Sequence, residues 1–185
     1  MTESDLCTRA IAYLKPVEQD STPAISLSHE DSPVFQSFSE DLLIAYVVDA
    51  GDRLAFVQHR HLHQETVSVD QLHSMAVSNL QALAEEKLVV RQYGAIYVAL
   101  MGGNFEASLL TLDVMWSHWY AHLAPESFVA VAPARDLLAF CDATSVQGLV
   151  ELRQVVERSQ NCDHPLHPHM YRRTGTKWQQ FPIVQ

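Results

Sequence analysis

Three histidines, His59, His61 and His63, stand at every second position in the segment VQHRHLHQET, and this spacing can support metal chemistry. If residues 57–63 continue a strand, the three imidazoles project from one face and can share an ion. If the chain turns helical after Val57, His59 and His63 lie one turn apart on one side. Zinc binds histidine nitrogen readily, but it needs a third or fourth ligand and oriented partners around them. A solvated polar run beside an edge strand is the simpler interpretation, and a zinc site is the alternative.

Other groups of histidines match no metal-enzyme motif. His118 and His122 stand four residues apart, but no glutamate lies between them as the HExxH motif of zinc proteases requires. We expect this pair to lie in the core or at an interface beside the aromatic residues around it. Near the C-terminus the segment HPLHPHM contains His164, His167 and His169, and its two prolines stiffen it. Metal binding is not the favoured interpretation of either group.

Templates for other kinds of catalysis are missing from the sequence. It contains no GxSxG nucleophile elbow, no GxxxxGK[ST] phosphate loop and no GxGxxG dinucleotide loop. The three cysteines are odd in number and lack a CxxC pair, so we predict free, mostly buried thiols, with Cys141 packed inward on a strand. Four carboxylates are assigned to caps and turns: Glu106, Asp113, Asp136 and Asp142. The chain is therefore predicted to be non-catalytic, with no cofactor unless zinc binds.

Net charge gives a stronger indication of function. The 185 residues include 22 acidic and 12 basic side chains, for a formal net charge of −10. Ten of the acidic side chains lie in the first 52 residues, against only Arg9 and Lys15. Such a surface disfavours nucleic-acid phosphates and attracts basic proteins. We therefore predict a basic protein partner and no nucleic acid, with these carboxylates as the contact residues: Glu40, Asp41, Asp49 and Asp52.

The leading hypothesis is a non-catalytic protein-binding domain. In its most concrete form the chain is an acidic immunity-type inhibitor that masks a basic toxin or nuclease by charge complementarity. Solubility alone is the simplest explanation of a charge of this size. Two functional alternatives stay open: a metal-dependent hydrolase built on the VQHRHLHQET histidines, and a small-molecule-binding regulatory module with a pocket lined by Trp116, Trp119 and Tyr120.

The hydrophobic pattern predicts an α+β fold. Helices are expected over residues 3–14, 68–87 and 144–159, with a further helical segment between 106 and 123. Strand pairs are expected at 42–48 with 53–58, at 88–92 with 95–100, and on both sides of Pro133–Asp136. Hairpins interleaved with single helices favour a mainly antiparallel sheet with three to four helices packed on it.

A single domain of 185 residues is expected, since this length fits one core. Residues 1–33 form an N-terminal helix and polar wrap, 34–159 form the core, and 160–185 form a His-rich irregular tail anchored by Trp178 and Phe181. No apolar run approaches the roughly 20 residues that cross a bilayer. The acidic N-terminus lacks the pattern of a signal peptide, so we expect a cytoplasmic protein with no membrane partner.

A pattern of short segments runs from Asp41 to Asp142 and includes AVSNLQAL, YVALMGGNFEASLLTLD and FVAVAPARDLLAFCDA. In this pattern the chain resembles the YtpQ-like bacterial proteins, a family with a domain of unknown function. The HRHLH run lies outside it. The resemblance implies a fold and no activity, cofactor or catalytic residue. It implies structural roles for the positions that match the pattern: Asn79, Leu80, Gly103, Ala107, Ser108, Pro133, Asp136 and Leu138.

Overall fold

The computed structural model describes residues 5–17, 27–51 and 53–182. Their contacts group into two compact units, Met1–Leu83 and Ala84–Gln185, and each is described by itself. Helices and antiparallel strands build both units, which confirms the predicted α+β class. The single-domain organisation stays a prediction. None of the helices in the described ranges combines the length and the hydropathy of a membrane span.

The first unit is organised around its longest strand, β3 (Leu42–Asp49), which pairs antiparallel with three others. Those strands are β1 (Ile11–Pro16), β2 (Phe35–Ser37) and β4 (Leu54–Phe56). Nearly every side chain of β3 is buried, as its continuous apolar run predicts for a central strand. The hairpin expected between residues 42 and 58 is confirmed, although its second strand is shorter than expected.

Three helices complete this part of the chain: α1 (Leu6–Arg9), α2 (His59–Glu65) and α3 (Val69–Lys87). The predicted capping box starts α3, because the Ser68 hydroxyl accepts the N–H of Gln71 at 3.2 Å and the Gln71 amide oxygen accepts the N–H of Ser68 at 2.9 Å. The Asn79 side-chain amide donates to the backbone oxygens of Thr8 (2.9 Å) and Ala10 (2.8 Å). These two bonds tie α3 to α1 and to the residue that precedes β1, so Asn79 has a structural role.

The N-terminal segment differs from the prediction of a helix over 3–14. The helix α1 has four residues, and the chain is extended from Ile11 onward as β1. All six residues of β1 pair with β3, from Ile11 opposite Val47 to Pro16 opposite Leu42. A helix this short is marginal by itself, so the ladder of backbone hydrogen bonds to β3 determines the conformation.

The second unit contains a six-stranded antiparallel sheet in the order β10-β9-β7-β8-β6-β5. Two of its hairpins were expected and are confirmed: β5 (Val89–Tyr93) with β6 (Ile96–Leu100), and β7 (Phe128–Ala134) with β8 (Leu137–Asp142). All seven side chains of β7 are buried. Both faces of the sheet must therefore be covered.

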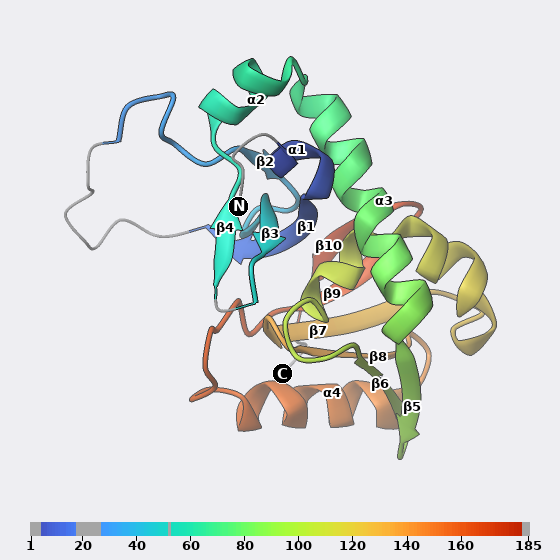
Figure 1. The fold of residues 1–185 in the computed structure, drawn as a ribbon. Helices are drawn as coiled ribbons and strands as arrows, with labels where there is room; N and C mark the ends of the chain where they lie inside the picture. The colour runs from blue at the N-terminus through green and yellow to red at the C-terminus, as the bar shows by residue number, and fades with distance from the viewer. Residues whose placement is uncertain (1–4, 18–26, 52, 183–185) are drawn as a thin grey trace. The chain divides into compact units, whose positions relative to one another are not determined.

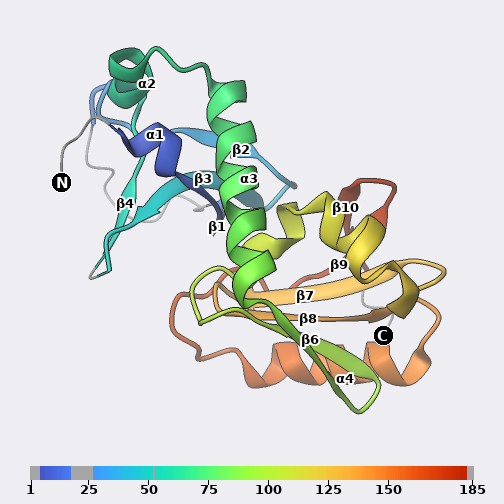
Figure 2. The same ribbon diagram turned by 45° about the vertical axis from the view of Figure 1, so that its right-hand side comes forward.

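Helix α4 (Val146–Arg158) covers one face of this sheet (Figure 1) and packs Leu152 and Val156 into its core, where Cys141 points inward as predicted. The segment with the short helices η2 (Ala107–Thr111), η3 (Met115–Trp119) and η4 (Ala121–Leu123) lies on the other face (Figure 2). Trp116 is its anchor, since its ring meets three aromatic rings edge-on at 4.9–5.2 Å: Phe128, Phe140 and Trp178.

The C-terminal segment is more regular than expected. Residues 170–181 form the hairpin β9 (Met170–Thr174) and β10 (Lys177–Phe181), and β9 pairs with the edge of β7. Its turn contains Gly175 at φ +62°, a conformation that glycine adopts without strain. Trp178 is a buried anchor as predicted, and its ring N–H donates to the Leu110 oxygen at 3.0 Å. Pairing of β9 with β7, and of β10 with β9, makes these residues strands even though their local sequence is largely charged and polar.

The packing of α4 against the six-stranded sheet can be tested at the close contact between α4 and β8. A Cβ added to Gly148 would lie 2.8 Å from the Cβ of Cys141, too close for two carbon atoms. Glycine to alanine inside a helix normally stabilises by about 1 kcal/mol, whereas forced overpacking costs about 1–3 kcal/mol. We therefore expect Gly148→Ala to lower the free energy of unfolding in urea. The exposed Gln154→Ala on the same helix is the control, and a stabilised Gly148→Ala protein would contradict this packing.

Candidate functional site

The three histidines at alternate positions lie on the helix α2 and do not form one ligand set. His59 and His63 are one turn apart on one side, as expected if the chain turns helical after Val57. His61 is only 3% exposed, and its Nδ1 accepts the backbone N–H of Gln58 at 2.9 Å. This bond caps the start of the helix. His61 therefore has a structural role. Of the candidate set His59, His61 and His63, only His59 and His63 stay available as metal ligands.

A turn from the segment before β2 lies along the start of α2. The backbone N–H groups of His59 and Arg60 donate to the oxygens of Ser32 (3.1 Å) and Glu30 (3.0 Å). The Gln58 side chain adds a bond to the oxygen of Asp31 at 2.6 Å. The first N–H groups of a helix have no acceptor within it, so this turn supplies them.

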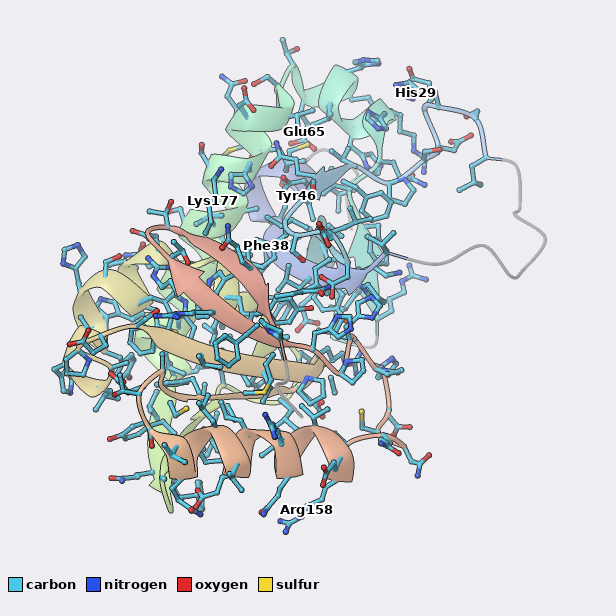
Figure 3. The ribbon with its side chains drawn as sticks, turned by 180° about the vertical axis from the view of Figure 1, so that it is seen from behind. His29, Phe38, Tyr46, Glu65, Arg158 and Lys177 are labelled. Carbon is cyan, nitrogen blue, oxygen red and sulfur yellow. The ribbon has the colours of Figure 1, made fainter. Side chains whose placement is uncertain are left out.

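The side chains of the same turn meet the two remaining histidines of α2. The ring of His29, on the segment labelled in Figure 3, stacks on that of His59 with centroids 4.1 Å apart. His63 Nδ1 lies 3.2 Å from a carboxylate oxygen of Glu30. We call His29, Glu30, His59 and His63 the histidine cluster. Burial lowers the pKa of His59, and the neighbouring His29 lowers it further, which favours the neutral ring at pH 7.

The carboxylates predicted to contact a partner lie at two separate corners of the first unit. Glu40 and Asp41 precede β3, and Asp49 ends it. A strand of this length separates its ends by roughly 23 Å, so the structure does not bring Asp49 to the other two. The Asp49 carboxylate accepts the N–H of Gly51 at 2.8 Å and shapes the turn to β4. Asp52 lies outside the described residues.

Two further acidic residues belong to the first unit's surface and were not singled out from the sequence. Glu30 and Asp31 have side chains about half exposed, at 50% and 47%. Asp31 pairs with Arg60 at 3.2 Å and accepts the hydroxyl of Ser28 at 2.7 Å. The Ser28-x-x-Asp31 spacing is a turn signal, but nothing in the sequence indicates that the turn packs against α2.

Two of the three cysteines are poorly suited to act as nucleophiles. Cys7, Cys141 and Cys162 are all free, and the first two are buried, as predicted. Burial raises the pKa of Cys7 to about 12 and that of Cys141 to about 12, so both thiols keep their protons at neutral pH. A protonated thiol is a poor nucleophile.

Four carboxylates of the second unit have separate surroundings, in line with the predicted caps and turns. Glu106 is buried and accepts the N–H groups of Met101 (2.7 Å), Gly103 (2.8 Å) and Phe105 (3.1 Å), which fixes the loop after β6. Asp113 pairs with Arg173, and Asp142 accepts from Thr144. Asp136 is exposed in the turn between β7 and β8. Of the pattern positions, Gly103 lies in this loop and Ser108 in η2, whereas Pro133 lies near the end of β7 and Asp136 in the turn that follows it.

Among the described residues, Trp116, Trp119 and Tyr120 do not form the aromatic pocket considered from the sequence. Trp116 fills the core, with 1% exposure, so it is not free to line a pocket with Trp119 and Tyr120. His167 and His169 stack at 5.4 Å, and His169 contacts Gln180. A largely apolar hollow of about 410 Å³ lies instead at the α2–α3 corner, lined by Thr66, Val67, Asp70, Gln71, Ser74 and Met75.

Comparison with known proteins adds one weak similarity. The chain is 24% identical over 123 residues to the UPF0354 protein BH3252 of Halalkalibacterium halodurans, a match that covers 66% of this chain and 46% of that protein. The chain thus spans less than half the length of this relative. No family model matches the chain, and no solved structure matches it. The similarity is consistent with an uncharacterised bacterial family.

The different roles of His61 and His63 on α2 can be tested by measuring the free energy of unfolding of two variants. His61→Ala removes a buried side chain and the acceptor of the Gln58 N–H, so we expect a loss of about 1–2 kcal/mol in the free energy of unfolding. His63→Ala changes an exposed side chain and should alter it by less than about 0.5 kcal/mol. Urea unfolding followed by circular dichroism in EDTA measures both. Equal effects of the two substitutions would contradict the assigned roles.

Proposed function

We propose that the chain is a non-catalytic protein that binds a basic protein partner through the acidic surface of its first unit. Its most concrete form is an immunity-type inhibitor that masks a basic toxin or nuclease. The observation that carries the proposal is the uneven charge. The first unit contains twelve acidic and four basic residues, whereas the second contains ten and eight.

The exposure of these carboxylates supports a role in association. Glu40 and Asp49 are exposed, and Glu30 and Asp31 are half-exposed. A surface with an excess of one sign of charge attracts the opposite sign over about a Debye length, close to 10 Å at 0.1 M salt. Such attraction raises the rate of encounter and selects basic partners.

The buried polar groups are consistent with a non-catalytic protein. The carboxylate of Glu106 is occupied by three backbone N–H groups, and the Cys7 and Cys141 thiols are held protonated. His61, the central member of the HRHLH run, is occupied as a helix cap. These interactions stabilise the fold. Among the features considered, charge complementarity therefore has the best support as the basis of function.

Family and location form part of the same proposal. We assign the chain to the YtpQ-like family on the pattern positions in its central region, supported by the weak similarity to a UPF0354 protein. We place it in the cytoplasm because its cysteines are free, which is typical of a reducing compartment.

Matched charge variants test the binding surface. The first variant combines Glu40→Gln, Asp41→Asn and Asp49→Asn, which keep the side-chain oxygens that accept from Ser39 and Gly51. The control variant removes the same charge from exposed positions of the second unit: Glu126→Gln, Glu157→Gln and Asp163→Asn. We expect tagged wild-type protein to retain a basic protein from the lysate of its own bacterium at 50 mM NaCl, and the control variant to retain it equally.

The first-unit variant should bind that protein roughly tenfold or more weakly, because attraction to the basic surface is reduced. Binding of the wild type should also fall as salt rises. Affinities are measured by titration with the purified partner in EDTA. Retention of no basic protein at low salt, or equal weakening by both variants, would contradict the proposal.

A further inference from the structure

We propose that His29, Glu30, His59 and His63 bind one divalent transition-metal ion of the zinc class at the contact between the 28–32 turn and α2. This inference goes beyond the proposed function and does not depend on it. Three imidazoles and one carboxylate are a ligand set that suits Zn²⁺.

The helix supplies the first two ligands in a spacing that is known to hold an ion. His59 and His63 are at i and i+4 of α2, where side chains on one face are about 5–6 Å apart at Cβ. The two histidines of zinc proteases use the same spacing. Here the intervening His61 points into the protein interior and is occupied by the Gln58 N–H, so it does not compete for the ion.

The turn supplies the other two ligands and is held in place by its backbone. Its Glu30 and Ser32 oxygens accept the N–H groups of Arg60 and His59, and the hydroxyl of Ser32 donates to the oxygen of Ser28 at 2.8 Å. The backbones of His29 and Glu30 are therefore fixed beside α2 before any ion binds. Each helical histidine already faces a ligand from the turn: His29 lies on His59, and Glu30 lies against His63.

The side chains would have to rotate to bind one ion. In this structure the four groups meet as two pairs and do not surround one point, since the rings of His29 and His59 stack face to face. His29 is exposed, and the side chains of His63 and Glu30 are 69% and 50% exposed, so little packing opposes their rotation. Zinc bonds of about 2.0–2.2 Å would replace the stack and the His63–Glu30 contact.

The number of ligands indicates what the ion would do. Four protein ligands complete a tetrahedral zinc site, whereas catalytic sites keep one position for water. The cluster therefore fits a structural clamp that joins the turn to α2 and differs from the hydrolase considered from the sequence. An ion that binds only the folded chain also raises the stability of that chain.

Zinc titration of the full chain, purified without a histidine tag and treated with EDTA, tests the site. We expect one Zn²⁺ per chain by calorimetry, with a dissociation constant of about 10 µM or below, and a zinc-dependent rise in melting temperature. Zinc should also slow hydrogen exchange at the amides of His59 and Arg60, which bond to the turn.

Variants separate this site from general binding to histidine. His29→Ala, His59→Ala and His63→Ala should each weaken zinc binding at least tenfold. The control His118→Ala/His122→Ala removes an exposed pair with the same sequence spacing and should bind zinc as the wild type does. The His61→Ala protein should be less stable than the wild type but should bind zinc with the same affinity. No zinc binding by the wild type, or wild-type affinity in the three cluster variants, would overturn the site. Neither result bears on partner binding, which is measured in EDTA.

Discussion

The first N–H groups of α2 need acceptors outside their own helix, and residues 30–32 supply them. This requirement fixes a turn beside the helix although the two are nearly thirty residues apart in the chain. A neighbouring hydrogen bond extends this contact: the N–H of Val34, just before β2, donates to the oxygen of Val57, just after β4, at 2.9 Å. The zinc site depends on this contact, which brings the histidine cluster together and holds two half-exposed carboxylates, Glu30 and Asp31, on the surface of the first unit.

Some acidic side chains accept hydrogen bonds that stabilise the fold, and others are exposed to solvent. Glu106 and Asp142 accept hydrogen bonds that shape loops, so their charge is compensated locally. Glu40 is exposed at the corner between β2 and β3, and Asp49, though it shapes a turn, keeps its carboxylate at the surface. Total net charge is therefore a weaker guide to a partner than the exposed carboxylates of one unit.

Local signals predicted the elements well, and tertiary contacts account for the differences. Local sequence was enough to predict α3 and β3. The start of α3 is indicated by the capping residues Ser68 and Gln71, and β3 is indicated by its continuous apolar run. The strands β1, β9 and β10 were missed because pairing determines them: β1 pairs with β3, β9 with β7, and β10 with β9. For the site, sequence spacing paired His59 with His63 but did not separate His61, whose role depends on burial. His29 was not identified because its contact with α2 is non-local.

The two proposals meet at Glu30, which contributes both to the acidic surface and to the histidine cluster. A zinc ion held by neutral histidines and this carboxylate would add two positive charges to a unit with an acidic excess of eight. The unit would stay acidic, so the ion would reduce its attraction for a basic partner without reversing it. The carboxylates at both ends of β3 contribute no ligand to the cluster and keep their charge. Metal binding and partner binding are therefore coupled by charge and share Glu30, whereas Glu40, Asp41 and Asp49 are proposed for partner binding alone.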